Sequence, residues 1–205
     1  MAAITISTNY SDILPYTLEA NRKFLKNWIF VTDVNDTKTI EILKKEPTIT
    51  ILYWDFQNGG RSFDKGGAVR YAQEYLYSKF PNDWYLILDS DICLSSNFYL
   101  DLNKLDENIA YGCSTRHDFY KLSDYRNNRN FYNCPTYNFP LGFFQLYKQH
   151  RYYEPSHSAA SCDDQFIKRS FSHWEMFNHF TCNHLVRNEV NWTGRKSTSD
   201  FLIDE

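Results

Sequence analysis

Two aspartates, Asp89 and Asp91, directly follow the apolar run at residues 84–88. Side chains two positions apart on an extended backbone point to the same side, so the two carboxylates would converge. Like charges this close repel, and one takes up a proton unless a cation lies between them. Mg²⁺ and Mn²⁺ bind carboxylate and phosphate oxygens alike. We therefore predict a divalent-metal site here; the alternative is a polar turn that ends a strand.

A second acidic pair, Asp163 and Asp164, lies at the start of residues 162–171, which have the pattern of a helix. Acids in a first turn stabilise a helix as caps and through its dipole. Neighbouring residues on a helix diverge by about 100°, so only one of the two can face a given pocket. We expect one to cap the helix and the other to serve as a general base.

The first 92 residues alternate between strand-like and helix-like segments. Strands are expected at residues 3–7, 28–32, 48–54 and 84–88, and helices at 11–27, 37–46 and 68–80. Ser11 and Asp36 are the expected N-caps of the first two helices. This alternation predicts an α/β fold with a mostly parallel sheet flanked by helices. Such sheets bind ligands at the carboxyl ends of their strands.

The second half is less regular. Residues 109–113 and 142–147 have the pattern of strands, and 162–171 that of a helix. Residues 114–140 are polar and rich in Asn and Tyr, without a clear period. We expect determinants for a second substrate there, because specificity loops vary.

Composition excludes several classes. The 205 residues carry a net charge of −3, which argues against a nucleic-acid binder. Hydrophobic residues make up 42% and aromatic residues 18%, which suits one globular domain whose rings could also contact sugars. No apolar run approaches the roughly 20 residues that span a bilayer, no secretory signal is visible, and the five cysteines form no CxxC pair. We expect a cytoplasmic protein without a membrane span.

The order of these features resembles the GT-A glycosyltransferases, especially the inverting family that includes chitin and cellulose synthases. The resemblance spans about residues 3–170. It implies one Rossmann-like GT-A domain over 1–205, with a nucleotide-sugar-binding half at 1–92 and an acceptor-binding half at 93–205. The matching pieces are Ile6-Ser-Thr-Asn9, Val31-Thr-Asp33-Val-Asn-Asp36, Asp64-Lys65-Gly66-Gly67-Ala68-Val-Arg70, Leu86-Ile-Leu-Asp89-Ser-Asp91 and Cys162-Asp163-Asp164-Gln165-Phe166.

By that resemblance, Asp33 accepts a hydrogen bond from the base of a uridine nucleotide. Thr8 and Asn9 would lie around the base and ribose, and Lys65 and Arg70 would be the cations near the donor. The sequence departs from the family pattern after Asp33, where a valine replaces the second acid.

The same resemblance assigns Asp89 and Ser90 to the donor, and Asp91, with Asp89, to Mn²⁺ or Mg²⁺. These enzymes often supply one further metal ligand near the carboxyl end, commonly a histidine. His184 is the best placed of the six histidines, although a lone histidine is more often a surface or core residue. Cations of the tail could close over the diphosphate or simply face solvent: Arg187, Arg195 and Lys196.

The implied activity is metal-dependent, inverting transfer of a hexose or deoxyhexose from a nucleotide-diphosphate sugar, UDP-linked, to a glycan hydroxyl. Asp164 would be the base, with Asp163 as the second choice; Asp163 stands where the family usually has glutamate. One alternative is a sugar-nucleotide pyrophosphorylase, which needs a glycine-rich loop that residues 7–11 lack. The other is a non-catalytic carbohydrate-binding module with exposed aromatics such as Tyr152 and Tyr153.

A narrower resemblance is to chlorella-virus glycosyltransferases that act on capsid glycans. It implies a viral protein whose acceptor is carried on a capsid glycoprotein in the host cytoplasm.

Overall fold

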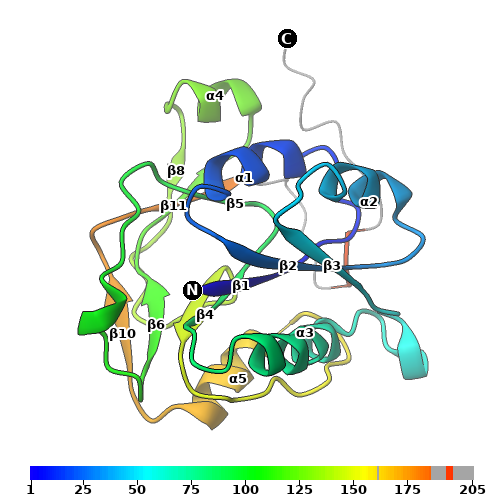
Figure 1. Cartoon of the computed structure of the whole chain (residues 1–205). Coiled ribbons are helices and arrows are strands. Elements are labelled where there is room, and N and C mark those ends of the chain that lie inside the picture. The colour runs from blue at the N-terminus through cyan, green and yellow to red at the C-terminus, as the bar shows by residue number, and fades with distance from the viewer. Residues whose placement is uncertain (161, 186–192, 196–205) are drawn as a thin grey trace.

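The computed structural model describes residues 1–160, 162–185 and 193–195. A seven-stranded sheet of order β10-β6-β9-β4-β1-β2-β3 forms its centre (Figure 1). Four neighbouring strands run parallel: β1 (Ala2–Ile6), β2 (Asn27–Thr32), β3 (Ile49–Tyr53) and β4 (Tyr85–Leu88). Strand β9 (Phe144–Tyr147) is antiparallel to both β4 and β6 (Ala110–Cys113), and β10 (Trp174–Phe177) is parallel to β6. The predicted α/β domain with a mostly parallel sheet is confirmed.

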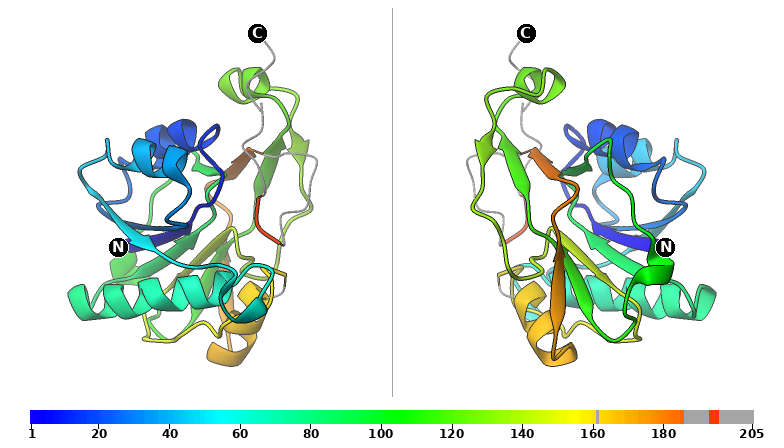
Figure 2. Two further views of the ribbon diagram at one scale, coloured as in Figure 1. Left: turned by 90° about the vertical axis from the view of Figure 1, so that its right-hand side faces the viewer. Right: turned by 90° about the vertical axis from the view of Figure 1, so that its left-hand side faces the viewer.

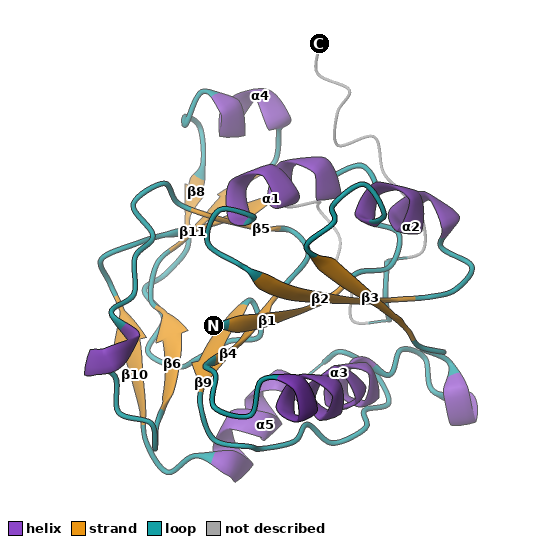
Figure 3. Ribbon diagram, viewed as in Figure 1, coloured by secondary structure: helices purple, strands orange, loops and turns teal. Residues whose placement is uncertain are grey.

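Helices cover both faces of this sheet (Figure 3). Helices α1 (Leu14–Asn21) and α2 (Thr37–Leu43) lie on one face, and α3 (Lys65–Lys79) and α5 (Cys162–Ser170) lie on the other. Two short 3₁₀ turns lie at Asn58–Gly60 and Leu102–Lys104. No helix within the described ranges is long and apolar enough to cross a membrane.

A second, four-stranded sheet was not predicted from the sequence. Its order is β5 (Ile92–Leu94), β11 (Cys182–Leu185), β7 (Arg116–Phe119) and β8 (Tyr132–Asn133). Figure 2 shows it beside the main sheet, with the short helix α4 (Leu122–Arg126) at its end. Residues 114–140, which showed no period, thus hold two strands and a helix. Because β5 begins one residue after Asp91, this sheet adjoins the predicted metal site.

Capping aspartates place two of the helices. Asp36 accepts a hydrogen bond from the backbone N–H of Thr39, as predicted for α2. Asp64 accepts from the N–H of Gly67, so α3 begins at Lys65, three residues earlier than expected. The predicted Ser11 cap is wrong: the N-cap of α1 is Ile13, without a side-chain hydrogen bond.

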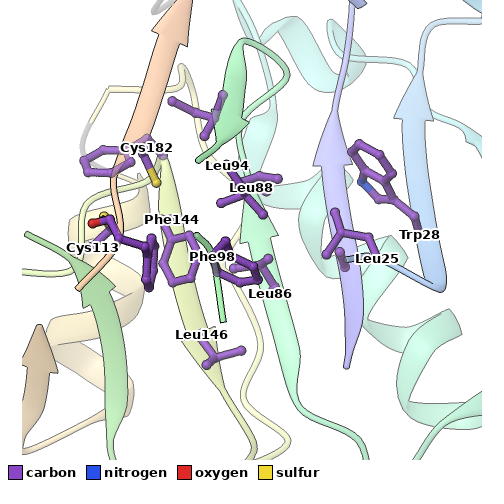
Figure 4. Packing of buried hydrophobic residues seen from close by; sticks show 14 of the residues in the cluster. Leu25, Trp28, Leu86, Leu88, Leu94, Phe98, Cys113, Phe144, Leu146 and Cys182 are labelled. Atoms are coloured by element: carbon purple, nitrogen blue, oxygen red, sulfur yellow. The ribbon is translucent and has the colours of Figure 1, made fainter. Parts of the chain in front are cut away.

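One large core cluster lies on the face of the seven-stranded sheet that carries α1, and it extends to β5 and β11 of the second sheet (Figure 4). Leu86, Leu88 and Phe144 are almost fully buried there. Cys113 at the end of β6 and Cys182 on β11 belong to the same cluster, so it joins the two sheets. Burying a large apolar side chain stabilises a fold by about 1.5–3 kcal/mol, so this core fixes the strand ends that carry the polar residues described next.

Candidate functional site

A buried lysine joins two of the predicted acids. Lys65 lies in the first turn of α3, and its side chain is only 9% exposed. Its Nζ is 2.9 Å from Asp89 Oδ1 at the end of β4, and 2.9 Å from Asp163 Oδ2 on α5. Burial alone would lower the pKa of Lys65, but the Asp163 and Asp89 carboxylates raise it well above its usual value. The ammonium therefore stays charged between them.

Asp163, and not Asp164, faces this lysine. Tyr153 donates its hydroxyl to Asp163 Oδ1 over 2.9 Å. Gly142 lies so close that a Cβ there would be 2.1 Å from Asp163 Oδ2. Asp164 is 40% exposed and lies 4.0 Å from Lys168, one turn along α5. The structure therefore brings the second-choice base to Asp89 and leaves the first choice on the helix surface.

Asp91 lies beside the predicted histidine. His184 Nε2 is 3.4 Å from Asp91 Oδ2, and His184 Nδ1 is 3.1 Å from Asp118 Oδ1. Strand pairing explains both contacts: His184 on β11 lies opposite Asp118 on β7, and opposite Ile92 on β5, the residue after Asp91. The backbone N–H of Leu185 also donates to the Asp91 carbonyl over 2.8 Å. The prediction of His184 as a metal ligand rested on chain order alone, whereas this register explains why His184 lies beside Asp91.

Asp118 and Arg116 were missed by sequence reasoning. Arg116 Nε is 2.8 Å from Asp118 Oδ1, and Arg116 Nη2 is 3.2 Å from Asp118 Oδ2. The signal that could have found them is the alternation in residues 116–119, where His117 separates Arg116 and Asp118 on an extended segment.

The pKa values of Asp89 and Asp91 shift in opposite directions. Burial, followed by Asp163 and Asp91, raises the pKa of Asp89 to about 6 even though Lys65 opposes the shift. Burial would also raise the pKa of Asp91, but His184 lowers it.

Burial alone would lower the pKa of His184, yet Asp91 and Asp118 raise it to about 9. Asp118 shows the converse: its pKa is lowered to about 2, because the hydrogen bond and charge of His184 outweigh burial. His184 is therefore an imidazolium at neutral pH and balances the buried carboxylates.

The residue types fit a hard divalent cation. Asp89 and Asp91 offer carboxylate oxygens and His184 an imidazole nitrogen, a set that Mn²⁺ accepts. In the described part of the chain no three His, Cys, Asp or Glu side chains already converge as ligands. Asp89 and Asp91 instead diverge, one toward Lys65 and the other toward His184. A bound cation would offset the repulsion among the carboxylates that gather here.

Polar groups without partners line the neighbouring strand ends. Of the buried side-chain atoms without a hydrogen-bond partner in the described residues, four lie at these strand ends: Ser7 Oγ, Thr8 Oγ1, Thr32 Oγ1 and Trp54 Nε1. Ser7 and Thr8 directly follow β1, Thr32 is the last residue of β2, and Trp54 directly follows β3. The N–H of Ser7 donates to the Val31 carbonyl and that of Trp54 to the Thr32 carbonyl, so these strand ends lie side by side. Buried polar groups are normally paired, so this edge has the character of a site for a polar ligand.

The predicted base-binding residues are at the same edge. Asn9 adopts a left-handed conformation (φ 62°), and its N–H donates to Asp36 Oδ2 over 2.6 Å. Asp33 is half-buried and accepts at Oδ1 from the backbone and side chain of Asn35, 2.8 and 2.9 Å away. Ser90 donates to the Ile6 carbonyl over 2.6 Å, which ties the turn after β4 to β1.

The predicted arginines are placed differently. Arg70 lies farther along α3, with Nε 3.3 Å from Glu74 and its guanidinium over the Tyr152 ring, away from Lys65 and its partners. Arg195 is buried and pairs through both terminal nitrogens with Asp12, at 2.6 and 2.7 Å.

The Asn9 side chain donates to the Arg195 carbonyl, so this short segment of the tail lies against the turn after β1. Arg187 and Lys196 fall outside the described residues.

The sequence matches no protein-family model and no curated protein. Among solved structures, it is similar to a Bacillus anthracis protein assigned as a glucose-1-phosphate thymidylyltransferase, in complex with a sucrose. The TM-score is 0.50, the identity 13%, and 88% of each chain is covered. A glycosyltransferase involved in glycosylating the major capsid of PBCV-1 aligns with a TM-score of 0.29 and 13% identity. That alignment covers 73% of this chain and 61% of the other. Both are named as transferases, and the first likeness shows a shared fold.

Proposed function

We propose that this chain is a glycosyltransferase. It would transfer a hexose or deoxyhexose from a nucleotide-diphosphate sugar, UDP-linked, to a glycan hydroxyl with the help of Mn²⁺ or Mg²⁺. The observation that carries the proposal is the cluster at the carboxyl end of β4. There Lys65 holds Asp89 and Asp163 together while Asp91 adjoins His184. Open α/β sheets bind ligands at this end, and phosphate groups need the cations found there.

The nucleoside would bind at the ends of β1 and β2. The unpartnered hydroxyls of Ser7, Thr8 and Thr32 provide donors and acceptors for a base and ribose. Asp33 follows β2 at the same edge, where its carboxylate can accept from the N–H of a uracil. These residues belong to the half of the chain, 1–92, that we propose binds the nucleotide sugar; residues 93–205 would bind the acceptor.

Asp91, His184 and Asp89 would hold the metal. When bound, the metal would offset the charge that builds up on the leaving diphosphate. Lys65 would contribute in the same way from the end of α3, because its ammonium already lies between two carboxylates of the site.

Asp163 is the better-placed base. It would take the proton from the acceptor hydroxyl as the new bond to the anomeric carbon forms. The bond from that carbon to the diphosphate breaks in the same step, and the configuration inverts. Each Asp163 oxygen accepts one hydrogen bond, from Lys65 or from Tyr153, and a carboxylate oxygen can accept two. Asp164, the choice from the family pattern, would serve the stability of α5.

Transfer of a nucleotidyl group is the second candidate, because the fold is shared with the thymidylyltransferase-named structure. The turn after β1 has no glycine, and Asn9 there is held by Asp36 and the Arg195 carbonyl. A triphosphate would therefore lack the open, glycine-rich backbone that such enzymes provide. A capsid-borne acceptor and action in the host cytoplasm stay predictions.

The test begins with binding. Titration calorimetry with the diphosphates of uridine, thymidine, guanosine and adenosine, each with and without Mn²⁺, should give tighter binding of the first two and dependence on Mn²⁺. Uracil and thymine present the same N–H, so they are not expected to separate. Asp91→Asn should weaken the part of nucleotide binding that depends on Mn²⁺. Asp101→Asn, at a surface ion pair with Lys104, should not.

Turnover separates the candidates. Release of nucleoside diphosphate from nucleotide sugars would support glycosyl transfer. Formation of pyrophosphate from a sugar 1-phosphate and a nucleoside triphosphate would support nucleotidyl transfer instead. Glycan binding without any nucleotide binding would favour the carbohydrate-binding module and reject both enzymes.

A further inference from the structure

Each nitrogen of the His184 ring faces a different carboxylate. Nδ1 is 3.1 Å from Asp118 Oδ1, and Nε2 is 3.4 Å from Asp91 Oδ2. The metal-free ring is an imidazolium, and a metal that binds it displaces one proton. In the resulting neutral imidazole one nitrogen carries the proton and the other a lone pair. Donation from Nδ1 to Asp118 leaves the lone pair on Nε2, which is the side of Asp91. The partner of Nδ1 thus decides which nitrogen is available as a ligand.

Asp118 is itself held firmly. It is 7% exposed, and Arg116 contacts both of its oxygens, at 2.8 and 3.2 Å. The Arg116 guanidinium lies over the rings of Tyr137 and Phe143, 5.5 and 5.2 Å from their centroids. A planar cation fixed by two rings fixes the carboxylate that it pairs with.

The second sheet brings these groups together. The parallel pairing of β7 with β11 places Asp118 opposite His184, and the antiparallel pairing of β11 with β5 places His184 opposite Ile92, next to Asp91. Arg116 therefore contacts Asp118, Asp118 contacts His184, and His184 contacts Asp91, because their strands are neighbours.

We propose that Asp118, held by Arg116, is a positioning residue that fixes the His184 ring with Nε2 toward Asp91, so that the site can bind a divalent cation. This inference rests on the proposed metal role of Asp91 and His184. It assigns to the second sheet the task of completing a site whose other residues come from the main sheet.

The experiment is a double-mutant cycle on Mn²⁺ affinity. Calorimetry with MnCl₂, with and without saturating uridine diphosphate, is done on wild type, Asp118→Asn, His184→Gln and the double variant. Loss of an outer partner of a metal-binding histidine typically costs about 10–100-fold in affinity. We expect a loss of about tenfold for Asp118→Asn, and no further loss when it is added to His184→Gln.

The cycle separates positioning from charge. A through-space effect of the Asp118 charge would persist without His184, so an equal loss in both backgrounds overturns the proposal, as does unchanged affinity in Asp118→Asn. Asp124→Asn is the matched control, because Asp124 is a buried acid nearby that pairs with Arg129 and Asn130. It should leave Mn²⁺ affinity unchanged.

Two further outcomes are informative. If Asp118→Asn does not fold by circular dichroism, Arg116→Lys keeps the charge but loses the planar contact with both oxygens. It should weaken Mn²⁺ binding several-fold in the wild-type background and not in His184→Gln; equal effects in both overturn the proposal. If wild type binds no Mn²⁺ even with nucleotide, the proposed function fails too. Failure of the cycle in a wild type that binds Mn²⁺ rejects only the role of Asp118.

Discussion

Replacing Lys65 by methionine tests the electrostatics of the site directly. Methionine keeps much of the apolar stem and removes the ammonium, so Asp89 and Asp163 lose their common partner. The two carboxylates then repel each other without a cation between them. The variant should be less stable than wild type, and its defect should depend on pH.

The size of the defect follows from burial. Removing one partner of a buried ion pair typically costs about 3–5 kcal/mol. Lys65 and Asp163 are 9% and 14% exposed, but Asp89 is 35% exposed and can regain water, so we expect the lower end, about 3 kcal/mol. For a chain of this length each kcal/mol shifts the melting temperature by roughly 2–4 °C, which gives a loss of about 6–12 °C.

The pH dependence has a definite sign. The pKa of Asp89 is about 6 with Lys65 present, and removing the ammonium raises it further. Asp89 in the variant is therefore neutral at pH 5, where the repulsion disappears, and it loses its proton only as the pH rises. The deficit relative to wild type should be largest at pH 8 and smaller at pH 5.

Scanning calorimetry of the metal-free protein at both pH values gives the answer. Lys79→Met is the matched control, since Lys79 is an exposed lysine of the same helix and its loss should cost no more than about 0.5 kcal/mol. A Lys65→Met variant that melts within 2 °C or so of this control at pH 8, or whose deficit is the same at both pH values, would refute the reasoning.

Three further predictions concern the acids and the histidine. Asp163→Asn should lower transfer by about 10²–10⁴-fold while Asp164→Asn stays near wild type in turnover assays; the reverse result would restore Asp164 as the base. Asp33→Asn should weaken uridine diphosphate more than adenosine diphosphate in calorimetry, and equal losses would reject base recognition. In the presence of a chelator, the raised pKa of His184 stabilises the fold fully below about pH 6.5, and this stabilisation is lost as the pH rises through about 9. The loss is up to about 3 kcal/mol; His184→Gln should lack this melting-temperature change, and an identical pH profile would contradict the ion pairs.

The first half of the fold could be predicted because its pattern is local. Each parallel strand there is a short apolar run, each helix lies between two strands, and Asp36 caps where a capping residue was expected. The ends of those strands carry Thr8, Asn9, Asp33 and Asp89, so their common edge followed from the general rule for such sheets.

The second sheet could not be predicted, because its strands are very short and pair across long stretches of sequence. Strand β5 has three residues and β8 has two, too few for a period to show. The position of His184 depends on pairing with β5 and β7, about 92 and 66 positions earlier in the chain. Alternation in residues 116–119 could place Arg116 and Asp118 on one side of a strand, but it could not show that this strand lies beside His184.

Which of Asp163 and Asp164 faces the site could not be predicted, for a different reason. The sequence showed that only one could face the site, but which one depends on the rotation of α5 about its axis. That rotation is set by Phe166 and Ile167, which are buried against the main sheet and carry Asp163 inward with them. Gly142 then leaves the space that the inward carboxylate needs. The family pattern assigned the role to the second residue, and the packing of the helix points to the first.

The buried charges themselves argue for a functional site. Asp89, Asp91, Asp118 and Asp163 gather near Lys65, Arg116 and His184, although ion pairs of this kind often stabilise a fold less than apolar residues of similar size. A fold under selection for stability alone would lose little by replacing them. The cluster lies at the edge where the ends of β1, β2 and β3 also leave polar groups without partners. Buried carboxylates and unpaired polar groups each raise the free energy of the folded chain, and both occur at this edge. A bound metal would offset the first effect and a bound nucleotide the second.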